Sequence, residues 1–144
     1  MPKILEIYLM SEFTQKGMIN METIQTQDAP QAIGPYSQAK KFGNLLFCSG
    51  QIPLDPKSME IVAGGVKEQT KKVCENLRAV LVAAGSDFNK VIKTTCYLKN
   101  MGDFQDFNAV YEEFFGASKP ARATIEVARL PKDVLVEIEL IAFV

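Results

Sequence analysis

The residues best suited to chemistry in this sequence are an arginine, a glutamate and a tyrosine in separate segments. Arg122 lies in Pro120-Ala-Arg-Ala-Thr124, and its guanidinium is a planar fork of donors that pairs bidentately with a carboxylate. Glu137 lies on the next predicted strand, where a carboxylate could orient or deprotonate a water molecule. Tyr36 follows Gly34-Pro35 in a turn whose rigid backbone would present the phenol. By themselves these residues leave the function open, because an Arg and a Glu on adjacent strands more often form a structural ion pair.

Other catalytic groups are scarce. The 144 residues include no histidine, which excludes His-based triads, His proton shuttles and His-ligated metals. Acid–base work must therefore fall to Asp, Glu, Tyr, Cys, Lys or bound water. The three cysteines, Cys48, Cys74 and Cys96, match no zinc or redox spacing, and each lies in an apolar segment. We interpret them as buried free thiols rather than nucleophiles, a pattern typical of a reducing compartment.

Length and charge limit the class of protein. A chain of 144 residues is one domain by size and can bury a core without metal or disulfide help. A net charge of −1 argues against binding driven by nucleic-acid phosphates. No apolar run approaches the roughly 18 residues of a membrane helix, so we expect neither nucleic acid nor membrane as a partner and predict a cytoplasmic protein.

The N-terminal segment differs from the rest. Residues 1–10 are apolar but short and contain Glu6, and they lack the features of a secretory signal. We predict that residues 1–20 are a leader or an upstream extension and that residues 21–144 form a single domain. The alternative is that the segment forms a real N-terminal strand.

Periodicity predicts an α+β domain. The expected order is strand, strand, helix, strand, helix, strand, strand, with Gly85 ending the first helix, Asp103 capping the second and Gly116 ending it. The elements placed most clearly are a strand over 44–49, a helix over 66–84, a strand over 91–99, a helix over 103–116 and strands over 121–128 and 134–143. Helices interleaved with strands suggest one sheet with both helices packed on a single face.

The last strand has two different faces. One carries Val134, Val136, Ile138, Leu140 and Ala142, which should meet the helices. The opposite face mixes apolar residues with glutamates: Leu135, Glu137, Glu139, Ile141 and Phe143. A sheet face of that mixture is usually covered by another subunit, so we expect an oligomer with polar groups in its interface. In the third strand, Ile92, Thr94, Cys96 and Leu98 are expected to share the more apolar face.

Several segments in order resemble the Rid family (YjgF/YER057c/UK114), the reactive intermediate deaminases. They are Ala32-Ile-Gly-Pro-Tyr-Ser-Gln38, Ser49-Gly-Gln-Ile-Pro53, Val91-Ile-Lys-Thr-Thr95, Phe107-Asn-Ala-Val-Tyr111, Phe114-Phe115, Pro120-Ala-Arg-Ala-Thr124, Val127-Ala-Arg-Leu-Pro131 and Val136-Glu-Ile-Glu-Leu-Ile-Ala142. The resemblance runs from about Ile24 to Val144, and the order and spacing of the segments make it specific.

The resemblance implies a fold, an assembly and an activity. Members fold as a chorismate-mutase-like α+β domain, here a mixed sheet with two helices on one face, and assemble as homotrimers with clefts between subunits. RidA-type members hydrolyse 2-imino acids, and enamine tautomers such as 2-aminoacrylate, to 2-keto acids and ammonia. The family arginine falls on Arg122, the glutamate on Glu137, the tyrosine on Tyr36 and the asparagine on Asn108, while Ser49 and Gly50 match the cleft-lining loop. The catalytic residues expected from this are Arg122, Glu137 and Tyr36. The residues expected to bind substrate are Arg122, Ser49, Gly50, Asn108, Ala123 and Thr124.

The same resemblance suggests a mechanism without metal or organic cofactor, because an imine carbon is already electrophilic. Arg122 would clamp the substrate carboxylate with help from groups near Gly50 and Ala123, and Glu137 would position or deprotonate the attacking water. Tyr36 would hydrogen-bond near the leaving nitrogen. The family often has cysteine two residues after the arginine; this chain has Thr124, which weakens a cysteine-dependent mechanism but not an arginine-centred one.

Three other functions stay open at this point. A non-catalytic module that binds or senses keto or amino acids would use Arg122 in the same way without needing Glu137. An endoribonuclease or translation-inhibitor activity has been ascribed to relatives, but a pI of about 5.5, no histidine and no basic cluster argue against it. A chaperone-like role is compatible with the sequence.

Overall fold

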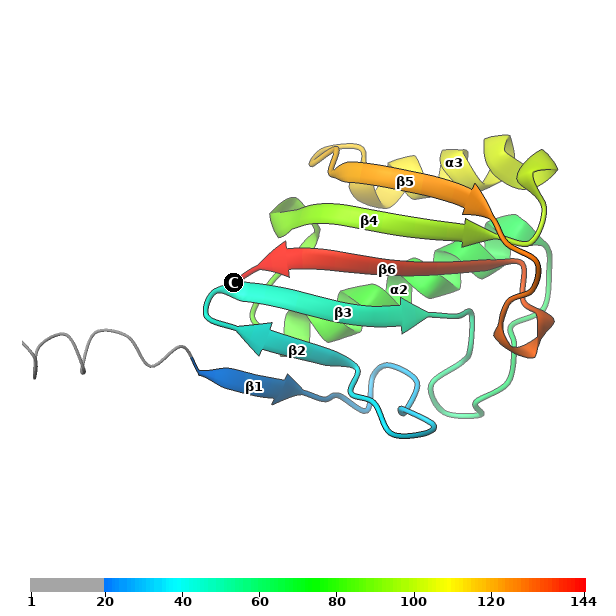
Figure 1. Cartoon of the computed structure of the whole chain (residues 1–144). Helices are drawn as coiled ribbons and strands as arrows, with labels where there is room; N and C mark the ends of the chain where they lie inside the picture. Colours follow the sequence, from blue (N-terminus) through cyan, green and yellow to red (C-terminus); the bar gives the residue numbers. More distant parts are fainter. Residues whose placement is uncertain (1–19) are drawn as a thin grey trace, which may run out of the picture.

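Six strands form one mixed sheet in a computed structural model that describes residues 20–144 (Figure 1). They are β1 (Met21–Ile24), β2 (Ala39–Phe42), β3 (Leu45–Gln51), β4 (Val91–Leu98), β5 (Ala121–Glu126) and β6 (Val136–Phe143). Only β4 and β5 pair in parallel; the other neighbours are antiparallel. The predicted leader lies outside the described residues apart from Asn20, so its assignment stays a prediction.

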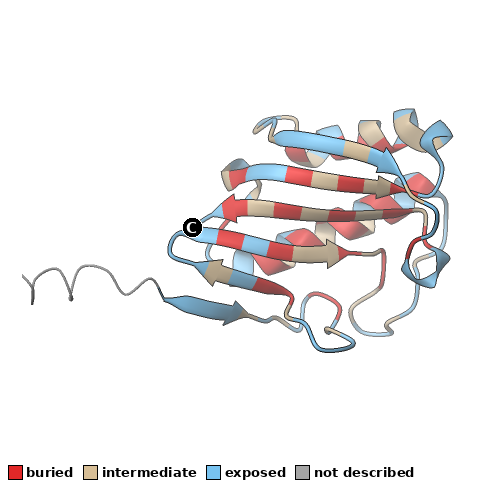
Figure 2. Cartoon of the chain, viewed as in Figure 1, coloured by how far each residue is buried: buried red, intermediate tan, exposed pale blue. Residues whose placement is uncertain are grey.

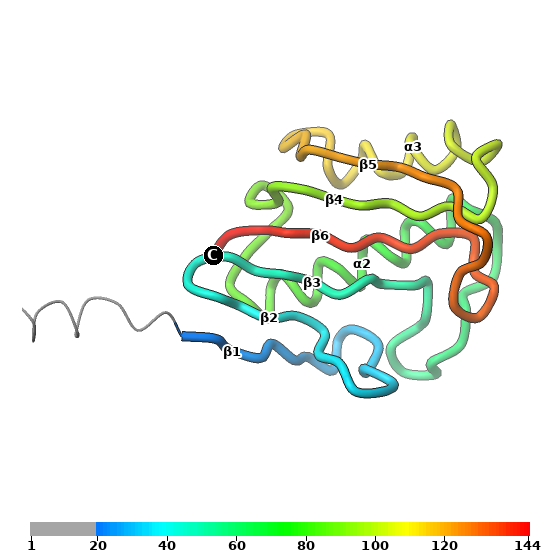
Figure 3. The backbone as a smooth tube through the Cα atoms, viewed as in Figure 1, coloured from blue at the N-terminus to red at the C-terminus, as the bar shows by residue number. Residues whose placement is uncertain are grey.

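The strand order is β1-β2-β3-β6-β4-β5. Three strands, not the predicted two, precede the first helix, because the short strand β1 pairs along β2. The last strand enters the middle of the sheet between β3 and β4 (Figure 3). As a result β5 is an edge strand, and it is not the neighbour of β6 that sequence adjacency suggested.

The two α-helices of residues 20–144 lie on the same face of the sheet, as predicted (Figure 1). Helix α2 spans Val66–Ala83 and buries a stripe against the sheet: Val66, Val73, Leu77, Val80 and Leu81. At its start the Glu68 carboxylate accepts from the backbone N–H of Gly65 at 2.8 Å. Gly85, at φ 76°, supplies the left-handed residue that follows the helix.

Helix α3 spans Phe104–Phe115 but begins differently from the prediction. Asp103 makes no side-chain capping bond, because a 3₁₀ turn, η2 (Met101–Asp103), runs directly into the helix. The capping oxygen is one turn earlier, where Asn100 Oδ1 accepts from the N–H of Gly102 at 2.8 Å. The aromatic stripe of α3 is core, as expected, with Phe107 and Phe115 fully buried.

The core lies between the sheet and the helices (Figure 2). The predicted apolar face of β6 is buried there, including Val136, Ile138 and Leu140. The three cysteines are buried too; desolvation raises the pKa of Cys48 to about 12 and that of Cys96 to about 11. These thiols have the inert environment that the sequence indicated.

One residue of β4 departs from the predicted alternation. Thr94, Cys96 and Leu98 face the core, but Ile92 is 45% exposed. The pairing of β4 with β6 shifts register between Val91 and Lys93, so Val91 is buried instead. A strict period of two could not reveal this irregularity.

Candidate functional site

A pocket of about 590 Å³ lies where β3 and β6 meet the loops at one end of the sheet. Four of the predicted site residues line it: Tyr36, Ser49, Gly50 and Glu137. The walls also include apolar side chains of Ile33, Ile52 and Leu54. The structure therefore brings half of the predicted constellation together in one chain.

Glu137 lies directly over Gly50 at the floor of this pocket. A register shift between Cys48 and Gln51 in the pairing of β3 with β6 brings the two residues together. A Cβ atom at Gly50 would collide with the Glu137 carboxylate, so glycine is the residue that permits this approach. Burial, and then the negative charge of Glu139, raises the pKa of Glu137.

Tyr36 is held by its own turn. Its backbone N–H donates to the Gly34 carbonyl at 2.9 Å, and its hydroxyl accepts from the N–H of Ile33 at 3.3 Å. The hydroxyl of Ser49 donates to the Ser37 carbonyl at 2.6 Å, which ties the turn to β3. With 54% of its surface exposed, Tyr36 is free to meet a ligand in the pocket.

Buried amide side chains fix the loops that wall the pocket. They are Gln38, Asn76 and Gln69. Gln38 donates to the carbonyl of Pro30 at 2.9 Å, Asn76 donates to that of Leu54 at 3.0 Å, and Gln69 accepts from the N–H of Leu135 at 2.8 Å. Loops without regular structure thereby gain fixed partners, which makes the pocket a preformed one.

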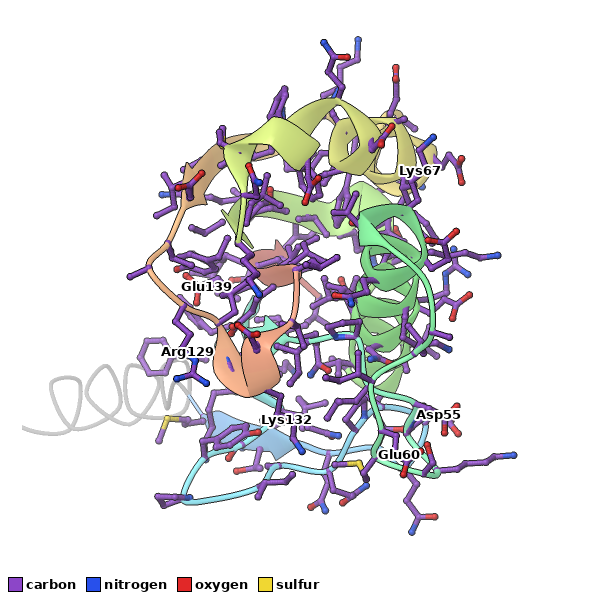
Figure 4. All side chains as sticks on the ribbon, turned by 90° about the vertical axis from the view of Figure 1, so that its right-hand side faces the viewer. Asp55, Glu60, Lys67, Arg129, Lys132 and Glu139 are labelled. Carbon is purple, nitrogen blue, oxygen red and sulfur yellow. The ribbon has the colours of Figure 1, made fainter. Side chains whose placement is uncertain are left out.

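Two charged residues of the pocket, Lys132 and Glu139, were not among the predicted site residues. Lys132 belongs to η3 (Pro131–Asp133) and has a left-handed backbone at φ 53°. Figure 4 shows Lys132 and Arg129 on the connection that leads from β5 to β6, the strand that carries Glu139. Glu139 accepts from the Tyr97 hydroxyl at 3.0 Å. The signal for Glu139 was present in the sequence, since it shares a face with Glu137.

Arg122 lies elsewhere, on the edge strand β5. Its partner in the register with β4 is Thr94, which is fully buried, so Arg122 points toward the helix side of the sheet. Its Nη1 donates to Asn108 Oδ1 at 2.7 Å. Its Cζ lies 4.6 Å from the ring centroid of Tyr111 and 5.6 Å from that of Phe104.

The predicted Arg122–Glu137 pairing does not exist within one chain. Ile138 faces the helices, so Glu137 points to the opposite face of the sheet from Arg122, and β4 separates their strands. Within residues 20–144, no carboxylate oxygen comes within the 4.0 Å of an ion pair with Arg122. The placement of both residues on neighbouring strands was wrong, because β6 enters the sheet at its centre.

The two predicted residues after Arg122 point to different sides. Thr124 is the register partner of Cys96 and faces the helix side, where its Oγ1 is buried without a hydrogen-bond partner among the described residues. Ala123 faces the other side of the sheet.

Among residues 20–144, no group of three or more acidic or cysteine side chains is placed to hold a metal ion. None of the described helices combines the length and apolar character of a membrane span.

Comparison with known proteins agrees with this geometry. The family model described as endoribonuclease L-PSP matches residues 26–144. The chain belongs to this family, the YjgF or Rid family. The resemblance to the Rid family that the sequence motifs indicated is thereby confirmed. The predicted α+β fold, with a mixed sheet and two helices, is confirmed as well.

This Rid family chain is 62% identical to a RutC family protein of Pyrococcus horikoshii over 122 residues, which cover 85% of the chain and 97% of that protein. It superposes on RidA from an Antarctic Psychrobacter with TM-score 0.82 and 44% identity, covering 85% of this chain and 99% of that one. The structure of Escherichia coli TdcF with bound serine matches with TM-score 0.81 and 44% identity, covering 85% and 98%.

Proposed function

We propose that this chain hydrolyses reactive 2-imino acids, such as 2-iminobutyrate and the imine tautomer of 2-aminoacrylate, to 2-keto acids and ammonia. The observation that carries the proposal is the state of Arg122. It is exposed on an edge strand and, among the described residues, is held by neutral groups, so its charge is available to an added carboxylate. Within residues 20–144 no carboxylate lies within ion-pair distance of Arg122.

The complete site requires a second copy of the chain. The pocket of one copy contains Glu137 and Tyr36, while Arg122 lies on the opposite face at the sheet edge. We propose a homotrimer in which the β5 edge of one copy closes the pocket of the next. The sheet face away from the helices supports this, because it exposes Phe42, Leu45, Phe47, Ile125 and Phe143 by 36–47% each. Light scattering should give about 48 kDa, three times the 16.0 kDa of one chain.

The carboxylate would be bound by a side chain and a backbone group together. Val127 N–H donates to Leu98 O on β4, and N–H directions alternate along a strand. The N–H of Thr124 therefore points off the free edge of β5 beside Arg122, whereas that of Ala123 points toward β4. This favours Thr124 over Ala123 as the second donor. The serine bound to the related TdcF also carries a carboxylate, which fits such a site.

The pocket would supply the water chemistry. Water adds to C2 of the imine, and Glu137 takes its proton and returns it to nitrogen. Glu137 then takes the proton of the new C2 hydroxyl and passes it to the amine, so that the C2–N bond breaks, the carbonyl forms and ammonia leaves. Tyr36 would hydrogen-bond at the leaving nitrogen or the new oxygen. No step needs a metal or organic cofactor, and the buried free thiols suit the cytoplasm as location.

The decisive test generates 2-iminobutyrate in place with a PLP-dependent dehydratase and follows formation of the keto acid. Wild type should accelerate the conversion, and Arg122→Ala should lose most of that acceleration through a higher KM. Equal rates with and without wild type would contradict the deaminase proposal. Full activity in Arg122→Ala would contradict the role of the arginine.

A binding module is the second candidate, favoured by the bound serine in TdcF. It would use Arg122 in the same way and would need no base at Glu137. Binding of 2-oxobutanoate, measured by calorimetry for Glu137→Gln, separates the two. If wild type turns over the imino acid and Glu137→Gln binds 2-oxobutanoate without turnover, the chain is an enzyme. If wild type itself binds 2-oxobutanoate without turning over the imino acid, the chain is a binding module.

A further inference from the structure

Helix α3 presents three residues to Arg122 along one line. Phe104, Asn108 and Tyr111 are spaced by four and three positions, which puts them on one stripe of a helix. All three contact the Arg122 guanidinium, two through ring faces and one through a side-chain oxygen. We define these residues as the α3 clamp.

We propose that the α3 clamp is a positioning device that aims Arg122 at its carboxylate ligand while leaving its positive charge uncompensated; the inference rests on the proposed function. A carboxylate in place of any clamp residue would hold the guanidinium equally well but would compete with the ligand for its charge. An amide oxygen and two aromatic faces orient a guanidinium without cancelling that charge.

Tyr111 is the fixed member of the clamp. Its ring stacks on Phe115 with centroids 4.4 Å apart and an interplanar angle of 24°. Its hydroxyl forms a buried 2.7 Å hydrogen bond with Thr94 Oγ1. Thr94 is also the register partner of Arg122. Tyr111, which packs against the guanidinium, is therefore bonded to the residue that lies beside the backbone of Arg122.

This arrangement gives Asn108 and Tyr111 roles apart from direct contact with substrate. The Oδ1 of Asn108 is occupied by the Arg122 Nη1 donor, so its effect on the ligand passes through the arginine. Tyr111 is buried and reaches the ligand in the same indirect way. Both are positioning residues, and their substitution should alter ligand affinity more than the chemical step.

The sharpest test is Asn108→Asp, which keeps the shape and the acceptor but adds a charge. KM for the imino acid and Kd for 2-oxobutanoate should both rise by about tenfold or more, because the new carboxylate neutralises Arg122. The matched control is Gln105→Glu, which adds the same charge at an exposed position of α3 outside the clamp and should leave both constants unchanged. An Asn108→Asp protein with wild-type KM and Kd would overturn the proposal.

A second pair separates positioning from stability. Tyr111→Phe loses the Thr94 hydrogen bond and should melt at a lower temperature, but its KM should rise less than that of Tyr111→Leu because the ring face remains. Tyr111→Leu should raise KM roughly 3- to 30-fold with a smaller change in kcat. Equal KM values for the two variants would contradict the clamp.

Two further readouts do not depend on turnover. In wild type the Arg122 side-chain N–H resonances, assigned by their absence from Arg122→Lys, should be shifted upfield by the ring current of Tyr111, and Tyr111→Leu should remove the shift. If wild type lacks hydrolysis, the deaminase proposal fails and the clamp is judged on Kd for 2-oxobutanoate. A wild type that does not bind 2-oxobutanoate would contradict both the deaminase proposal and the clamp.

Discussion

Arg122 and Glu137 lie on opposite faces of the same sheet, with strand β4 between the strands that carry them. Among residues 20–144, Arg122 has no carboxylate at ion-pair distance and the pocket around Glu137 has no arginine. Arg122 is held by neutral partners, and the pocket that contains Glu137 has Lys132 as its one lysine or arginine in the described part of the chain. Any reaction that uses both residues must therefore occur between two copies of the chain.

Mixed assemblies test this relationship. Arg122→Ala and Glu137→Gln should each be nearly inactive alone, since each spoils every site. When the two variants are unfolded together and refolded at equal amounts, random assembly should restore both wild-type groups in about a quarter of the sites. The control is mixing without unfolding, which should restore nothing at first. A refolded mixture as inactive as its components would contradict a shared site.

Gly50 should control the position of the Glu137 carboxylate. In Gly50→Ala, the new Cβ meets that carboxylate and must displace it, because the side chain is the part able to move. We expect kcat to fall roughly 10- to 100-fold, with KM much less affected, because the base is misplaced while Arg122 is untouched. Steady-state kinetics measures the split; Gly65→Ala, outside the pocket and with room for a Cβ atom, serves as the matched control.

The pH dependence of the reaction should report Glu137. A base must be deprotonated to act, so activity should fall as pH falls through the pKa of this residue, which burial and Glu139 raise above the ordinary range of a glutamate. Glu139→Gln removes the neighbouring negative charge and should move the acidic limb to lower pH. Glu113→Gln, on the exposed side of α3, should leave it in place. An acidic limb that does not respond to Glu139→Gln would rule out Glu137 as the titrating base.

Asn76 should support both stability and the pocket. It is buried and donates to the carbonyls of Ile52 and Leu54, so Asn76→Ala leaves both acceptors without this donor. We expect a loss of about 1–3 kcal/mol in the free energy of unfolding and a raised KM. Chemical denaturation measures the first; Asn89→Ala, at an exposed position, should change it by less than about 0.5 kcal/mol. Equal stabilities of the two variants would show that the amide does not hold the loop.

Local chemistry made much of the fold predictable from the sequence. The stripe on α2, the aromatic stripe on α3 and the two faces of β6 all follow from helical and strand periods, and the structure places them as those periods require. Gly85 follows the end of α2 with a left-handed backbone, which glycine adopts more easily than other residues. The family motifs then indicated which polar residues to examine, among them Tyr36 and Asn108.

The sequence by itself determined the elements, their buried faces and the residue types available for chemistry, because these depend on near neighbours along the chain. Strand order, register and the partners of Arg122 were decided only by tertiary structure. Insertion of β6 between β3 and β4 separated Arg122 from Glu137, and a register shift beside Gly50 brought Glu137 over the pocket floor. These outcomes depend on packing between residues distant in sequence, where the hydrogen bonds of the backbone are the same for every pairing and only the buried side chains distinguish one arrangement from another.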